Sequence, residues 1–241
     1  MTTLAFIPMF FDPRYFIYVG PAILLAMWAQ YKVKSAYAKA GRIPARSGMS
    51  GAETAQRILN AFGIADVSIE PVQSFLGDHY DPRRKALRLS PDVYHGRSLA
   101  AVGIAAHEVG HAIQDAQAYA PLALRNGLVP MASVGSNLSV ILIIAGVVLS
   151  GMQLAFGGII AAAGLGLFGV VVLFQLVNLP VEFNASSRAR AILVDQGIVT
   201  VQEDRVVGDV LSAAAMTYVA ATITAISQML YFASIVFGRR N

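Results

Sequence analysis

The stretch AAHEVGHAIQ, residues 105–114, holds two histidines four positions apart, with a glutamate directly after the first. Residues four apart on a helix lie on one face about one turn from each other, so His107 and His111 can direct ring nitrogens at one ion. Glu108 is rotated from them by about 100°, which leaves it free of the metal and able to reach a bound water. The pattern therefore predicts a zinc-binding helix that carries a general base.

The alternative interpretation is that both histidines are core residues whose rings bond to carbonyl groups. The chain has only four histidines, and this pair comes with the glutamate that hydrolysis requires, so we favour metal binding. Small residues beside the pair would let another element approach the helix closely, although they also mark helix packing in membrane proteins. They are Ala105, Ala106, Gly110 and Ala112.

Two histidines do not complete a catalytic site. A catalytic zinc takes three protein ligands and keeps a fourth position for water, whose pKa falls to about 7. Glu108 would take the proton of that water and pass it to the leaving amine. The third ligand is expected in NLPVEFNASSRARAIL, where Glu182 is the candidate.

Pro180 can occupy the first turn of a helix, which would put Glu182 at a helix start. In that position the Glu182 carboxylate could instead interact with the helix dipole or lie at the membrane–water interface without binding metal. Because the His-Glu-x-x-His motif is present, we favour the ligand role. We predict one Zn²⁺ per chain, held by His107, His111 and Glu182.

The elements that position these residues are strongly apolar. Hydrophobic residues make up 56% of the 241 residues and charged residues 13%, whereas charged residues are about a quarter of an ordinary soluble domain. No Asp, Glu, Lys or Arg occurs at 126–181 or at 210–238. Since a spanning helix needs about 20 apolar residues, we predict spans at 128–150, 154–179 and 211–237.

A fourth span is predicted at 15–31, after the aromatic run FIPMFFDPRYF. Lysines follow this span rather than precede it, which favours a retained anchor over a cleaved signal peptide. In a four-span chain most basic loop residues fall on one side, which the positive-inside rule assigns to the cytoplasm, although Arg239 and Arg240 oppose this. Loop basicity accounts for the net charge of +4, so no nucleic-acid partner is expected. The absence of cysteine excludes disulfides and thiolate metal sites.

The polar segments 32–127 and 180–209 fall on the same side of the membrane and can build one site. In the longer segment, Ser50 and Glu53 have capping-box spacing ahead of AETAQRILNAFG, a helix that ends at Gly63. VSIEPV and KALRLS alternate like strands, with Pro71 at an end or edge position, and GDHYDPRR favours a turn. A helix is predicted at 98–118.

The expected fold is therefore mainly α, with about four membrane helices that carry a small α+β zincin-like catalytic cap. The predicted division is an anchor at 1–31, the cap with the His-Glu-x-x-His helix at 32–127, two transmembrane helices at 128–179, a helical segment with the third ligand at 180–209, and a last transmembrane helix at 210–241.

Three stretches, DHYDPRRKALRLS, AAHEVGHAIQ and NLPVEFNASSRA, occur in this order between hydrophobic spans. Together they resemble the YugP-like integral-membrane neutral zinc metallopeptidases of bacteria and, more distantly, the HtpX and CAAX-processing gluzincin proteases. The likeness covers nearly the whole chain. It implies a zinc-dependent endopeptidase in which His107, His111 and Glu182 hold the metal and Glu108 is the general base.

The resemblance also implies that the strand before the active-site helix, at 86–90, is a sheet edge to which the substrate backbone adds. His79 or Tyr80 could then donate to the developing oxyanion. An equally good interpretation is that DHYDP is a turn held by its aspartate side chains.

The third motif departs from the related family, which usually has an aspartate where this chain has Asn184; more distant relatives place one at the position of Ser186. A carboxylate partner orients a ligating imidazole and raises its basicity. Asn184 or Ser186 can still accept a hydrogen bond, but more weakly, and Asp195 or Asp115 are other candidates.

These observations predict a membrane endopeptidase in the inner membrane, with its site facing the cytoplasm and acting on membrane or membrane-adjacent polypeptides. The lipid bilayer is its other expected partner. One alternative is a non-catalytic adaptor whose zinc is structural or whose site has decayed, which Asn184 favours. The other alternative, a transporter, fits poorly because the spans lack charged residues.

Overall fold

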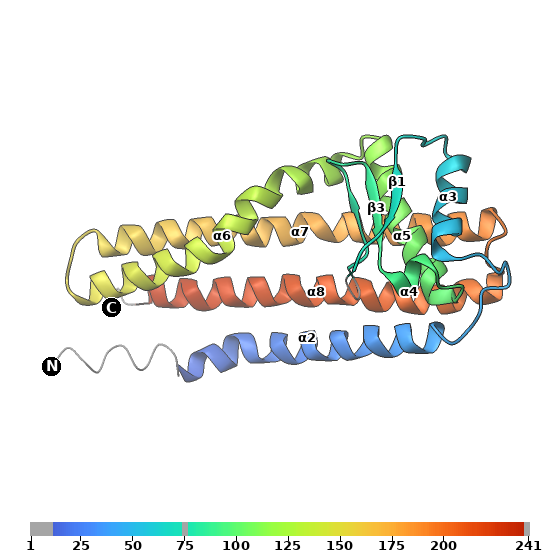
Figure 1. Ribbon diagram of the computed structural model, residues 1–241. Coiled ribbons are helices and arrows are strands. Elements are labelled where there is room, and N and C mark those ends of the chain that lie inside the picture. Colours follow the sequence, from blue (N-terminus) through green and yellow to red (C-terminus); the bar gives the residue numbers. More distant parts are fainter. Residues whose placement is uncertain (1–11, 74–76, 239–241) are drawn as a thin grey trace. The chain divides into compact units, whose positions relative to one another are not determined.

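The computed structural model describes residues 12–73 and 77–238 (Figure 1). Part of the aromatic run before the first span, together with Arg239 and Arg240, lies outside the described residues. Among the described residues, four helices are long and apolar enough to cross a membrane, which confirms the predicted mainly α class. These helices are α2 (Pro13–Ala40), α6 (Ala120–Gly151), α7 (Gly157–Asp195) and α8 (Val201–Phe237).

Contacts between residues divide the chain into two compact units. The first unit comprises Met1–Trp28, Arg125–Val177 and Tyr218–Asn241, and the second comprises Ala29–Leu124 and Asn178–Thr217. Each unit has its own hydrophobic core. All residues predicted to bind metal or to act in catalysis belong to the second unit.

The first unit exposes large apolar side chains along its helices. Ile17 on α2 is 73% exposed, and Ile159 on α7 is 72% exposed. Exposed apolar surface of this extent is unfavourable in water and is what a lipid-facing helix requires. These exposures agree with the long apolar helices in indicating a membrane protein.

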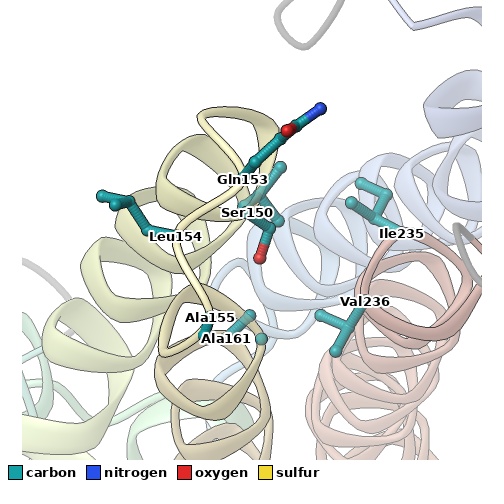
Figure 2. A pocket seen from close by; sticks show the side chains of 9 residues that line it. Ser150, Gln153, Leu154, Ala155, Ala161, Ile235 and Val236 are labelled. Carbon is teal, nitrogen blue, oxygen red and sulfur yellow. The ribbon is translucent and has the colours of Figure 1, made fainter.

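The first unit also contains a cavity of about 340 Å³, lined by side chains near the α6–α7 turn and the end of α8 (Figure 2). Ser150 and Gln153 are the polar members of a lining that is otherwise apolar or glycine. None of the lining side chains is titratable, so the cavity offers no group for acid–base chemistry.

The sheet of the second unit has three short strands, β1 (Ser68–Pro71), β2 (His79–Asp81) and β3 (Ala86–Leu89). Their order is β1-β3-β2, with β1 parallel and β2 antiparallel to β3. Because β3 is the central strand, the prediction that 86–90 forms the sheet edge is wrong. The edges are β1, as Pro71 indicated, and β2, which arises from the segment predicted as a turn.

Side-chain caps mark the start of two helices of the second unit, and the cap of the first was predicted. In α3 (Gly51–Ala61), Ser50 and Glu53 form both bonds of the capping box, and Gly63 after the helix has a positive φ of 67°. The helix α5 (Leu99–Ala116) begins after Ser98, whose side chain accepts from the amide of Ala101. It contacts α3, β2, β3 and the short helix α4 (Pro91–Tyr94), so the predicted metal-binding helix lies within the core.

Helix α7 runs without interruption from Gly157 to Asp195, and Pro180 lies inside it. The prediction that a new helix begins at Pro180 is therefore wrong. Proline removes one backbone hydrogen bond and disfavours a helix interior, but membrane helices tolerate it because neighbouring groups satisfy the freed carbonyl. Glu182 consequently lies in the body of a long helix.

Candidate metal centre

Three side chains from two helices converge at one point in the second unit. The distance from Glu182 Oε2 is 3.3 Å to His107 Nε2 and 3.7 Å to His111 Nε2, and the three candidate ligand atoms lie within 4.8 Å of one another. Ligands at tetrahedral angles, about 2.0–2.1 Å from a zinc ion, are separated by about 3.3 Å. The donor set and its spacing therefore fit one zinc ion.

This cluster is mostly buried. Glu182 is only 2% exposed, and a buried carboxylate requires a compensating positive charge. Burial alone would lower the pKa of His111, but its interactions with Glu182 and the charge of Glu108 outweigh burial and raise that pKa above its usual range. The local field thus favours a cation between these side chains.

Close approach of α5 and α7 brings the ligands together. A Cβ atom added at Gly110 would lie 2.9 Å from the carbonyl oxygen of Ala185 and 3.2 Å from its Cα. The prediction that small residues on α5 admit another element is confirmed at this position. Gly110 lies between the second histidine and Glu108, so the contact lies directly beside the ligands.

Gly110→Ala is expected to destabilise the protein by about 1–3 kcal/mol, the usual cost of overpacking, and to lower zinc affinity. The methyl group meets the α7 backbone, which must move and take Glu182 with it. Thermal unfolding and zinc titration of the detergent-solubilised protein measure both effects. Gly166→Ala on α7 is the control, because its Cβ meets nothing within 4 Å; an equal loss in this control would contradict the explanation.

Glu108 lies next to the cluster but outside the group of three ligand atoms. It is only 8% exposed, and its Oε2 accepts a hydrogen bond of 3.1 Å from the backbone N–H of Tyr80 on β2. An edge strand therefore holds one oxygen of this carboxylate. The geometry suits a general base beside the metal.

The two side chains predicted as oxyanion donors point to different partners. The Tyr80 hydroxyl donates to Asp115 Oδ2 at 2.8 Å, and Lys85 Nζ donates to the same oxygen. Burial, and then the bond to Asp115, raise the pKa of Tyr80, so its hydroxyl remains a donor. His79 is exposed, and its Nδ1 lies 2.7 Å from the carbonyl of Gly77. A role for either residue in catalysis stays a prediction.

Each histidine of the cluster has a neutral hydrogen-bond partner on its other nitrogen. Ser186 Oγ lies 3.2 Å from His107 Nδ1, and Gln114 Oε1 lies 3.0 Å from His111 Nδ1. Asn184 instead accepts from Gln114 and Arg188. Sequence reasoning missed Gln114, although its position three residues after His111 puts both on one helix face.

Comparison with known proteins agrees with this geometry. The model of a family described as "Putative neutral zinc metallopeptidase" matches residues 15–237. The chain is 46% identical over 227 residues to "Putative membrane protease YugP" of Bacillus subtilis (strain 168), covering 94% of this chain and 98% of that relative. No solved structure matches the chain significantly.

Proposed function

We propose, on the premise that this chain belongs to the neutral zinc metallopeptidase family, that it cleaves peptide bonds in membrane or membrane-adjacent proteins with Glu108 as the general base. The observation that carries this proposal is the convergence of two imidazoles and a buried carboxylate beside a second carboxylate that is not a ligand. A purely structural metal site has no use for that second carboxylate.

When bound, zinc supplies Lewis acidity and lowers the pKa of a water molecule in its open position. Glu108 takes a proton from the water that attacks the peptide carbonyl carbon, and delivers it to the amide nitrogen as the C–N bond breaks. Because the amide of Tyr80 donates to Oε2, we assign the proton transfer to Oε1. The hydrogen bond keeps the carboxylate from rotating away.

The substrate class can be tested with the purified protein in liposomes. We expect an unfolded model polypeptide to be cleaved, cleavage to stop after zinc removal by a chelator, and zinc to restore it. Attaching the same polypeptide to a membrane anchor should raise kcat/KM at least tenfold, because tethering raises its effective concentration. Cleavage by the metal-free protein would contradict the metal-dependent mechanism, and equal rates for both substrates would contradict the membrane preference.

We also propose that β2 supplies the side chain that donates to the oxyanion. His79 is the stronger candidate because it is exposed, whereas the Tyr80 hydroxyl is engaged by Asp115. Loss of one such donor typically lowers kcat by about 10²–10³. We expect a decrease of this size for His79→Ala and a decrease below tenfold for Tyr80→Phe; the reverse order would assign the role to Tyr80.

The proposed location is the inner membrane, with the site facing the cytoplasm, and the basic residues flanking the spans support this orientation. The chain has no cysteine, so a single cysteine at the exposed position of Asn60→Cys on α3 reports its side directly. A membrane-impermeant maleimide should label it only in permeabilised cells. Labelling in intact cells would place the site outside.

A further inference from the structure

We infer that Gln114 is a positioning residue that fixes the tautomer of His111 and ties the histidine helix to the helix that carries Glu182. This inference rests on the metal centre proposed above and concerns a residue that is not itself a ligand. Gln114 is completely buried, with 0% of its surface exposed. It makes three hydrogen bonds through its one amide group, at 3.0, 2.9 and 2.9 Å.

The partners of Gln114 allow only one orientation of its amide. Nε2 lies 2.9 Å from the backbone carbonyl oxygen of Val181, and a carbonyl can only accept a hydrogen bond. The NH₂ group must therefore face α7, which turns Oε1 toward His111. A flipped amide would place its oxygen against the Val181 carbonyl oxygen, with no hydrogen between these two buried acceptors, which is costly.

Asn184 reinforces the same orientation. Arg188 Nε, which can only donate, lies 2.7 Å from Asn184 Oδ1. The Asn184 oxygen therefore faces both Arg188 and the Gln114 amide, and it accepts from Gln114 Nε2 at 2.9 Å. Two acceptors on α7, one of them set by an arginine, thus fix the Gln114 amide.

The orientation of Gln114 determines which nitrogen of His111 can bind metal. Since Oε1 is an acceptor, His111 Nδ1 must carry the proton and donate to it. Its Nε2 then presents a lone pair toward Glu182, on the side where the ligand atoms converge. Hydrogen bonds on the far nitrogen set the tautomer of metal-ligating histidines in this way.

In the described part of the chain, no group fixes the tautomer of His107 in this way. Its Nδ1 faces the hydroxyl of Ser186, and a hydroxyl can either donate or accept. The bond is therefore compatible with both tautomers of His107. This difference makes Gln114 the group that selects the binding tautomer, and it predicts that Gln114 matters more for zinc affinity than Ser186.

Zinc binding by the metal-free full-length protein, in competition with a chromophoric chelator, tests the role. Gln114→Met keeps the side-chain length but loses all three bonds, and we expect zinc to bind 10–100-fold more weakly, as is typical when an outer partner of a ligand is lost. Gln114→Glu keeps the acceptor for His111 and should bind zinc more tightly than Gln114→Met. The visible spectrum of the cobalt-substituted protein should change in Gln114→Met, because His111 is no longer held.

Gln56→Met is the matched control. Gln56 is an exposed glutamine on α3 whose Nε2 donates to Asn60 Oδ1 at 2.9 Å, so its bond lies outside the polar network around His111. We expect its zinc affinity and cobalt spectrum to equal those of the wild type. Equal affinities and spectra of wild type and Gln114→Met, or an equal loss in Gln56→Met, would overturn the inference. If Gln114→Met does not fold, Gln114→Glu is compared with the wild type instead, because it keeps the acceptor for His111. A tenfold lower zinc affinity of Gln114→Glu with an unchanged cobalt spectrum would overturn the tautomer role, since the acceptor would then not preserve zinc binding.

The same assay separates this inference from the proposed metal centre. Wild-type protein that binds no zinc, or a His111→Ala variant that binds it as well as wild type, would contradict the centre itself. Normal wild-type binding that His111→Ala abolishes, together with unchanged binding in Gln114→Met, would contradict only the role of Gln114.

Discussion

Glu108→Gln is expected to leave one zinc bound per chain and to lower kcat by about 10²–10⁴, the range that general acid–base catalysis contributes. The amide has the same shape as the carboxylate, and its oxygen can still accept from the N–H of Tyr80. Glu108 is also outside the group of candidate ligand atoms. The variant therefore removes the base without removing a ligand.

Metal analysis measures the zinc bound per chain, and single-turnover cleavage of a peptide substrate measures the loss of catalytic rate. Glu70→Gln is the control, because Glu70 is a half-exposed carboxylate on β1 that pairs with Arg88; this variant should cleave normally. Undiminished cleavage by Glu108→Gln would refute the assigned role. Loss of zinc from Glu108→Gln would show instead that Glu108 contributes to metal binding.

Glu182→Ala is expected to reduce zinc well below one ion per chain. The change removes the one anionic ligand of the cluster, leaving two neutral imidazoles. We expect the loss of affinity to exceed the 10–100-fold typical of losing a partner outside the ligand set. Cleavage should fall with occupancy and recover in part at high zinc concentration.

Asp195→Ala provides the comparison, because Asp195 is an exposed carboxylate on the same helix and should bind zinc as wild type does. Zinc content after dialysis against metal-free buffer distinguishes the variants. Full occupancy in Glu182→Ala would exclude Glu182 as a ligand. The thermal unfolding of both metal-free variants should be compared, so that a loss of fold is not mistaken for a loss of binding.

The sequence predicted the local part of the site well, because local spacing on a helix has a direct geometric meaning. The positions of His107 and His111 needed only the helical repeat, and the helix predicted at 98–118 agrees with α5, which the structure shows to be capped by Ser98. The prediction of the partner carboxylate, Glu182, depended on the small number of polar segments outside the membrane spans. The structure brings all three ligand candidates together.

Features that depend on tertiary pairing were harder to predict. Strand β2 has only three residues, too few for an alternation signal, so the sequence predicts a turn there. The edge position that the family resemblance implies for β3 is wrong because β2 pairs with β3 on the side opposite β1. Pro180 predicts a helix start because proline is well suited to the first turn of a helix, whereas it lies inside α7. Neither the strand order nor the tolerance for Pro180 can be obtained from residue spacing alone.

The departure at Asn184 has a structural explanation. Its oxygen accepts from Gln114 and Arg188, so the asparagine has a defined place in the polar network around the ligands. Ser186, at the other departure, contacts His107. The residue that favoured a decayed, non-catalytic site is thus part of an intact arrangement of polar side chains.

The continuity of α7 restricts how this sequence can change in evolution. No loop separates the apolar part of the helix from Glu182, and each residue of a helix advances the chain by about 1.5 Å and turns it by about 100°. Inserting or deleting one residue just before Pro180 would therefore alter the helical phase of Glu182 relative to the preceding apolar stretch. The number of residues in this part of the helix is therefore constrained, in addition to the apolar character of its side chains.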